Sequence, residues 1–192
     1  METIVDNIAG YDYGANELTT SPVTMKELEL LKQTITLDSD DQKYLRMAGD
    51  VLEPQTESIV NMWRGVISSM PHLAHYFKNE AGKADEQHKA KGKVWFKQWI
   101  MNLCYKPYDQ DWLNYQHEIG LRQSVKKDKD AAPFIPMRYM IAFTAVINDS
   151  IKTFMARNGH SLGVIEKMHK AWCKAVLLHV TLWTRAYCAS EW

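Results

Sequence analysis

The stretch YDQDWLNYQHEIGLRQS, residues 108–124, decides the fold class of this chain. Its apolar residues return every three or four positions, as along one face of an α-helix, and no alternation typical of a strand occurs. A step of 100° per residue places Trp112, Ile119 and Gln123 on one stripe of this helix. His117 lies about 120° around the helix from Gln123, away from that stripe. The stretch therefore predicts an amphipathic helix with Gln123 on its inner face.

The helical period continues outward from this stretch in both directions. Asp38 and Ser161 stand where N-caps are expected, and Gly159 stands where a helix would end. Helices of unequal length favour a globin-like stack over a four-helix bundle. The sequence thus predicts an all-α fold of seven to eight helices, over 25–34, 38–52, 56–70, 71–77, 89–103, 109–123, 137–157 and 161–187, with loops at 78–87 and 124–136.

Length and charge restrict the function. A chain of 192 residues suits one domain, here 24–192, preceded by an irregular leader over 1–23. Equal numbers of basic and acidic residues, 23 each, argue against non-specific nucleic-acid binding. No apolar run of 18 residues predicts a membrane span, and the start of the chain lacks the features of a signal peptide. The three cysteines form no CxxC pair, so no zinc site is expected. We therefore expect a soluble, cytoplasmic protein without a metal site of that kind.

Several ordered motifs carry a resemblance to a known family. Besides residues 108–122, they are LLK at 30–32, AGDVLEPQ at 48–55, PHLAHYF at 71–77, WFKQWI at 95–100, IPMRYMIAF at 135–143, KMHKAW at 167–172 and LHVTLW at 178–183. From Ile8 to about Tyr187 the chain resembles the protoglobins, single-domain relatives of the globin-coupled sensors. The resemblance implies a globin fold with haem between the distal helices and the helix that contains YQHEIGLR. In the family the proximal histidine follows that motif directly, whereas here Gln123 and Ser124 follow it.

The resemblance also implies a set of pocket residues. Positions that line the haem cavity of the family are retained in kind, and we expect the ligand pocket to consist of Trp63, Phe96, Ile119, Gln123, Phe143 and Ile147. Arg64 stands where the family commonly has a tyrosine that bonds a haem-bound gas. The amide oxygen of Gln123 is a poor axial ligand compared with imidazole, thiolate, thioether or phenolate. We therefore expect the pocket of the family to be kept, with a different polarity. If haem is bound, His117 is the expected ligand.

Three residues are candidates for catalysis. Arg64 could hold an anionic or carbonyl-bearing ligand through its planar guanidinium group. Asp149 or a pocket histidine, His179, could move a proton. Each has an ordinary structural explanation as well: Arg64 reaches solvent or pairs with a carboxylate, Asp149 lies on a solvent-facing helix edge with Asn148 and Ser150, and His179 is a satisfied core histidine.

Three functional hypotheses remain open on these residues. The first is a haem-free, cofactor-free pocket protein that binds an apolar small molecule, with a role in a biosynthetic pathway. If it is an enzyme, the candidate catalytic residues and the aromatic pocket walls suit a cyclisation, isomerisation or dehydration. Such a protein would be a lyase, isomerase or cyclase and not an oxidoreductase. The second is a haem-binding protoglobin with a non-standard axial ligand, serving the binding or sensing of O2, CO or NO. The third is a regulatory module; the resemblance implies a homodimer formed through 137–157 and 161–187.

Overall fold

The computed structural model describes residue 8 and residues 11–77, 86–124 and 135–188, without the side chains of 77, 86–89 and 91. Within these ranges every regular element is helical, so the predicted all-α, globin-like fold is confirmed. The α-helices are α1 Met25–Thr34, α2 Ser39–Leu52, α3 Thr56–Ser69, α4 Pro71–Ala74, α5 Glu86–Tyr105, α6 Gln110–Ser124, α7 Met137–Met155 and α8 Leu162–Thr184. Short 3-10 turns follow α2, α4 and α7, at Glu53–Gln55, His75–Phe77 and Ala156–Asn158.

Local sequence determines most of the helix ends. Thr24 and Asp38 each form a reciprocal capping box, with Glu27 and Asp41 respectively, and each cap stabilises its helix by about 1 kcal/mol. Gly159 adopts the left-handed conformation, φ 72°, after the turn that follows α7, as the predicted stop requires. Ser161 is the residue before α8, but its side chain makes no capping hydrogen bond.

Two predicted helices had wrong boundaries. Helix α5 begins at Glu86 and ends at Tyr105, so it is longer than the predicted 89–103. Helix α8 ends at Thr184, because the backbone N–H of Arg185 bonds to Leu182 and the last residues tighten into a turn. The predicted loops at 78–87 and 124–136 lie largely outside the described residues.

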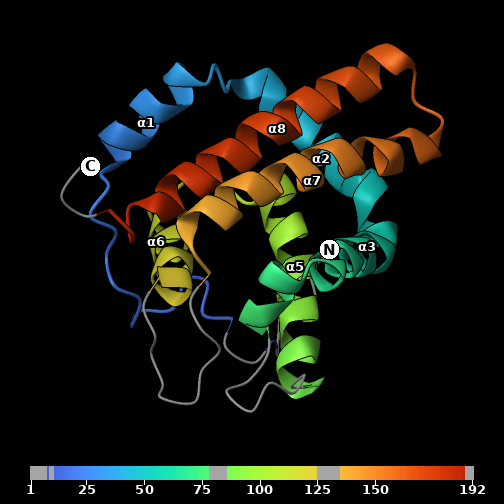
Figure 1. Cartoon of the computed structure of the whole chain (residues 1–192). Coiled ribbons are helices and arrows are strands. Elements are labelled where there is room, and N and C mark those ends of the chain that lie inside the picture. Colours follow the sequence, from blue (N-terminus) through green and yellow to red (C-terminus); the bar gives the residue numbers. More distant parts are fainter. Residues whose placement is uncertain (1–7, 9–10, 78–85, 125–134, 189–192) are drawn as a thin grey trace.

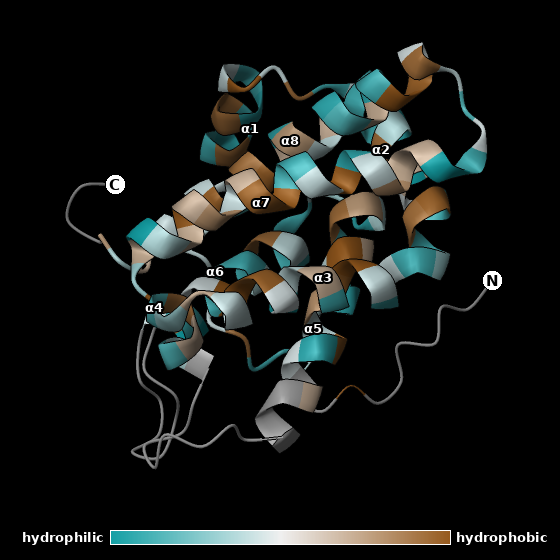
Figure 2. Ribbon diagram, turned by 45° about the vertical axis from the view of Figure 1, so that its right-hand side comes forward, coloured by the Kyte–Doolittle hydropathy of each residue, from teal (hydrophilic) through white to brown (hydrophobic). Residues whose placement is uncertain are grey.

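Helix α8 is the centre of the packing. It runs antiparallel beside α7, packs against α2 and contacts α6 near its own C-terminal end (Figure 1). Helix α5 crosses beneath this layer and packs against both α2 and α3. Each helix shows hydrophobic and hydrophilic residues in alternating bands (Figure 2), and the hydrophobic ones supply the core. Three fully buried tryptophans, Trp63, Trp112 and Trp172, are its largest side chains.

The leader has no regular structure in its described part, yet three of its side chains hold it against the helices. The Tyr11 hydroxyl donates to Asn102 at 3.0 Å, and the Tyr11 and Tyr13 rings each lie 5.3 Å from the Tyr115 ring of α6. Asp12 forms an ion pair of 2.5 Å with Arg122. The leader is therefore part of the packed domain surface.

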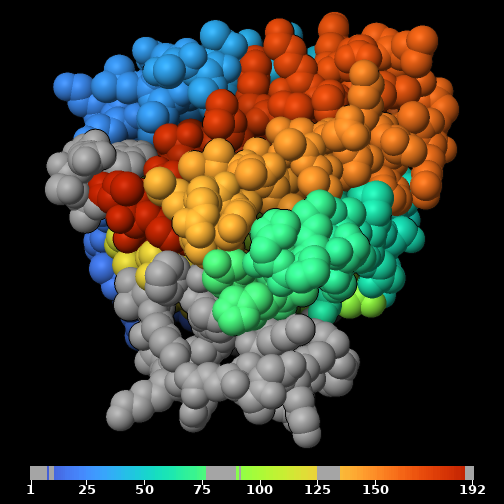
Figure 3. Space-filling model, viewed as in Figure 1, coloured from blue at the N-terminus to red at the C-terminus, as the bar shows by residue number. Residues whose placement is uncertain are grey.

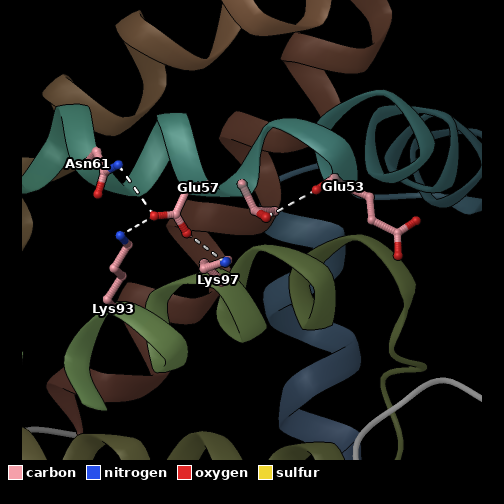
Figure 4. A network of polar contacts seen from close by, with 6 residues as sticks. Glu53, Glu57, Asn61, Lys93 and Lys97 are labelled. Carbon is pink, nitrogen blue, oxygen red and sulfur yellow. Dashed lines mark hydrogen bonds and ion pairs between the residues drawn. The ribbon is translucent and has the colours of Figure 1, made fainter. Parts of the chain in front are cut away.

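An ion-pair network connects α3 to α5 (Figure 4). Glu57 of α3 pairs with Lys93 and, at 2.8 Å, with Lys97, while Asn61 completes the group at 3.5 Å. The two ammonium groups lower the pKa of the Glu57 carboxyl to about 2. Because these groups are exposed, the network orients the two helices but adds little to stability at physiological salt.

Among the described residues, no helix combines the length and the apolar content that a membrane crossing requires.

The contact between α6 and α8 predicts an effect of a single methyl group. A Cβ at Gly120 would lie 3.1 Å from the backbone oxygen of Trp183 and 3.2 Å from its Cα, so Gly120→Ala must push the two helices apart. We expect a loss of about 1–3 kcal/mol in the free energy of unfolding, measured by urea denaturation. The matched control is Gly65→Ala on α3, where a Cβ meets no atom within 4 Å. This variant should gain about 0.5–1 kcal/mol. Equal effects of the two substitutions would contradict the close packing at Gly120.

Candidate functional site

Trp63 forms one wall of the candidate site and is held rigidly. It lies on α3 with no exposed surface, and its indole N–H donates to the Ser150 hydroxyl of α7 at 2.9 Å. Its ring lies 6.3 Å from the Phe96 ring and 6.1 Å from the Trp99 ring, both on α5. The hydrogen bond satisfies the single donor of the indole, so the apolar face of Trp63 is fixed relative to α5 and α7.

Two residues of α7 complete this apolar group. Ile147 is buried in the same core cluster as Trp63, and Phe143 packs against that cluster half-buried, as Phe96 does. The structure therefore brings together four of the six predicted pocket residues, from three helices that are distant in sequence. The remaining two, Ile119 and Gln123, lie on α6 and are not part of this cluster.

The orientation of α6 follows from its contacts with α8. The Trp112 ring lies 5.2 Å from the His179 ring, and the Gln116 side-chain oxygen accepts a hydrogen bond from the Trp183 indole at 3.0 Å. Gln123 lies about 20° from each of Trp112 and Gln116 on the helix wheel. It therefore belongs to the inner stripe, as predicted, and its side chain is half-buried.

A second face of α6 meets the leader and α5. Tyr115 contacts the rings of Tyr11 and Tyr13, and Arg122 pairs with Asp12 and Glu118. The Arg122 guanidinium also lies 5.2 Å from the Trp95 ring of α5. Arg122 thus connects three segments directly beside Gln123, and these contacts restrict any rotation of α6.

His117 lies on another side of the helix. It is about 140° around α6 from Arg122, and the charges that act on it are those of Glu118 and Arg185. Burial lowers the pKa of its half-buried imidazole, so the ring is neutral at pH 7. A neutral imidazole has the lone pair that a metal needs, but His117 is turned away from the face that meets α5.

His179, a candidate acid–base residue, lies in the core. Its ring has no exposed surface, and Nδ1 accepts a hydrogen bond of 3.1 Å from the Trp99 indole N–H. An indole can only donate, so the proton of the neutral ring is on Nε2, which has no hydrogen-bond partner among the described residues. Burial lowers the pKa of His179 to about 3. The ring therefore stays neutral, which argues against its predicted role in proton transfer near neutral pH.

The other two candidate catalytic residues lie on helices other than that of His179. Arg64 is half-buried on α3, between the buried residues Val60 and Ile67 on the same face. Asp149 is exposed on α7. Its neighbours do not share one solvent-facing edge: Ser150 accepts the Trp63 hydrogen bond, and the Asn148 carbonyl lies 2.7 Å from the ring nitrogen Nε2 of His169. For Ser150 the expected solvent-facing edge is wrong, because the residue turns inward to Trp63.

The described residues offer little support for a metal site or for a cysteine nucleophile. No group of three or more His, Cys, Asp and Glu side chains is placed there to hold a metal ion. Cys104, Cys173 and Cys188 are free thiols, and burial raises the pKa of Cys104 and of Cys173. These thiols are therefore poor nucleophiles.

Sequence reasoning missed three residues that organise the site. Trp99 contacts Trp63, Trp172, His179 and Trp183, and thereby connects the apolar wall to α8. Ser150 fixes Trp63, and Trp183 holds Gln116. Trp99 and Trp183 had a sequence signal, namely a place on the inner face of a predicted helix. The hydrogen bonds of Ser150 and Trp183 join residues 87 and 67 positions apart, and no local pattern reveals them.

The order and packing of the helices define a globin-like protein. The protoglobin family model matches residues 24–192, and the chain therefore belongs to the protoglobin family. Among solved structures, the globin domain of the Geobacter sulfurreducens globin-coupled sensor is similar, with a TM-score of 0.62 and 13% sequence identity. The match covers 83% of this chain and 96% of that domain. At this identity the likeness shows the fold alone. A search of curated proteins finds no match.

The neutral state of His179 predicts a specific pH dependence of stability. The folded protein lowers the pKa of this ring from 6.5 to about 3, so between these values the unfolded chain binds the proton and the folded chain does not. Stability is therefore fully present above pH 6.5 and falls as the pH drops toward 3. At pH 5 the loss from this one group is about 2 kcal/mol. In His179→Phe, the decrease in unfolding free energy from pH 7 to pH 5 should be smaller by about 2 kcal/mol, measured by urea denaturation.

The comparison separates two effects of the His179→Phe substitution. The lost hydrogen bond to Trp99 lowers stability equally at both pH values, whereas the titration of His179 changes only the difference between them. Identical pH slopes in the two proteins would show that His179 is not held neutral by the fold.

Proposed function

We propose that this protein is a small-ligand-binding globin, with haem as the first candidate for the group held between α3, α5, α6 and α7. The observation that carries the proposal is the single apolar group formed by Trp63, Phe96, Phe143 and Ile147. A flat apolar macrocycle suits walls of this kind, and rigid aromatic side chains cost little entropy on binding. Membership of the protoglobin family also supports haem as the first candidate.

The axial position is where the chain departs from the expected haem site. The inner stripe of α6 carries Gln123, whose amide oxygen is a weak ligand for haem iron. His117 is neutral, but it is turned away from the face that meets α5. The Nε2 atom of His179 carries the proton of its ring, so it offers no lone pair while Trp99 bonds to Nδ1. The walls are apolar, as haem requires, whereas Gln123, His117 and His179 offer no strong axial ligand.

The apolar side chains that form the walls of the site would then contribute most of the binding energy for haem. Trp63, fixed by Ser150, and Phe96 provide apolar surface on one side, and Gln123 provides a polar amide on the α6 side. A bound haem would supply an iron centre for a diatomic gas, which corresponds to gas binding or sensing. Arg64 would add a hydrogen-bond donor at the position where the family commonly has a tyrosine.

A second candidate is a crevice that holds an apolar organic molecule in place of haem. Gln123 favours it, because the loss of a strong axial ligand would weaken haem while leaving the walls intact. The residues expected to catalyse a cyclisation or isomerisation do not form a unit: Asp149 is exposed and His179 is neutral and buried. We therefore propose ligand binding for this crevice and no reaction.

The resemblance to protoglobins also implies a homodimer, which we retain as a proposal. Helices α7 and α8 lie next to each other on one broad face of the molecule (Figure 3). They carry the exposed apolar side chains Ile141, Leu162 and Leu177, of which Leu162 is 81% exposed. Apolar surface of this kind supports pairing through these helices. Sedimentation equilibrium tests the proposal, and a monomer at all concentrations would exclude it.

The first experiment on function is an absorption spectrum of protein produced with ample haem precursor. We expect the wild type to show a strong haem band, and Gln123→His to bind haem more tightly because imidazole is the better axial ligand. The control is His117→Ala, which should leave the band unchanged because His117 is turned away from α5. A colourless wild type beside a red Gln123→His variant would support the second candidate. If neither protein binds haem, the crevice does not accept haem and the proposal fails.

A further inference from the structure

A small cavity of about 140 Å³ lies between α1, α2 and the segment that joins α5 to α6. Its lining includes the apolar side chains of Leu45 and Leu103. Its rim is cationic, because Lys32 of α1, Arg46 of α2 and Lys106 after α5 all line it. None of the ten lining side chains is a carboxylate. Three cations from three separate segments thus meet at this cavity, in a chain with no net charge.

Two of these cations are held in place by aromatic rings. The Lys106 ammonium lies 4.1 Å from the centroid of the Tyr13 ring, and the Lys32 ammonium lies 5.6 Å from that of Tyr108. The Lys32 side chain is only 15% exposed, so it differs from a freely moving surface lysine. Ring contacts of this kind orient an ammonium without neutralising its charge. The site is therefore partly organised before any ligand binds.

The acidic groups near the cavity balance only part of this charge. Glu29 pairs with Lys32 at 2.7 Å, and Asp50 accepts a hydrogen bond from the Tyr105 hydroxyl at 2.6 Å. Arg46 has no ion pair or hydrogen bond with another described residue, and its guanidinium is exposed at the cavity. Gln42, half-buried in the lining, adds an amide that can donate hydrogen bonds. The lining thus contains more donors than the protein's own acceptors use.

We propose that this cavity binds a phosphate group, either as inorganic phosphate or as part of a small phosphate ester. A guanidinium and two ammonium groups match the charge and the several acceptor oxygens of a phosphate dianion. The volume holds several water molecules and so suits one phosphate group. Leu45 and Leu103 would contact the apolar part of an ester. The site shares no residue with the proposed haem crevice, so it goes beyond the function proposed above.

The test is a titration of the purified full chain with inorganic phosphate at low, constant ionic strength, followed by the backbone amide signals of residues 103–106 and 108 in NMR spectra. We expect saturable shifts in these signals. Arg46→Gln and Lys106→Gln should each weaken phosphate binding by roughly tenfold. The matched control is Lys43→Gln, which removes one charge from an exposed position on the same helix α2 but does not line the cavity. This variant should bind phosphate as the wild type does.

A second titration with butyl phosphate, an ester with an apolar alkyl group, separates the two forms of the ligand. Tighter binding than that of inorganic phosphate would indicate an ester whose apolar part contacts Leu45 and Leu103, and equal or weaker binding would indicate phosphate itself. Shifts that do not saturate, or an equal loss of binding in Arg46→Gln and Lys43→Gln, would overturn the proposal, because general charge attraction would then explain the result. Neither outcome depends on whether the protein binds haem.

Discussion

The hydrogen bond from the Trp99 indole to Nδ1 of His179 is the interaction on which the rest of the core depends. It spans 3.1 Å between α5 and α8, and both partners are surrounded by other rings. Trp112 of α6 contacts His179 from a further side, and Trp183 contacts both His179 and Trp99. Because an indole can only donate, this bond requires a neutral imidazole with its proton on Nε2. A charged imidazole at this depth would be strongly disfavoured, so three helices are joined around one neutral ring.

This junction determines what the candidate crevice offers to a ligand. With Trp112 against His179 and Gly120 against the backbone of Trp183, α6 has one permitted orientation. That orientation places Gln123 on the inner stripe and His117 on a different side. On the opposite side of the junction, Trp99 contacts Trp63, which Ser150 fixes. The placement of the aromatic walls and of Gln123 and His117 on different sides of α6 thus follows from one packing arrangement, and ligand binding is the function that we propose for this site.

Sequence reasoning could predict whatever depends on neighbouring residues. The helical period and the caps at Thr24 and Asp38 are local signals, and the helices from α1 to α3 accordingly lie where the sequence placed them to within about two residues. The inner stripe of α6, with Trp112 and Gln123, follows from the same period. Longer-range features had no such signal. The Trp63–Ser150 bond and the ion pair between Asp12 and Arg122 join residues far apart in the chain, and the burial that keeps His179 neutral depends on the packing of α5, α6 and α8.

The protonation state of His179 can be observed directly by 15N NMR of the imidazole nitrogens in protein labelled at histidine. The packing described above predicts a neutral ring at pH 7, with the proton on Nε2 and an unprotonated Nδ1 that accepts the bond from Trp99. The same signals should persist at pH 5, as long as the protein stays folded. A ring that carries its proton on Nδ1, or that titrates between these two pH values, would contradict the central role of this bond. It would also restore His179 as a candidate for proton transfer.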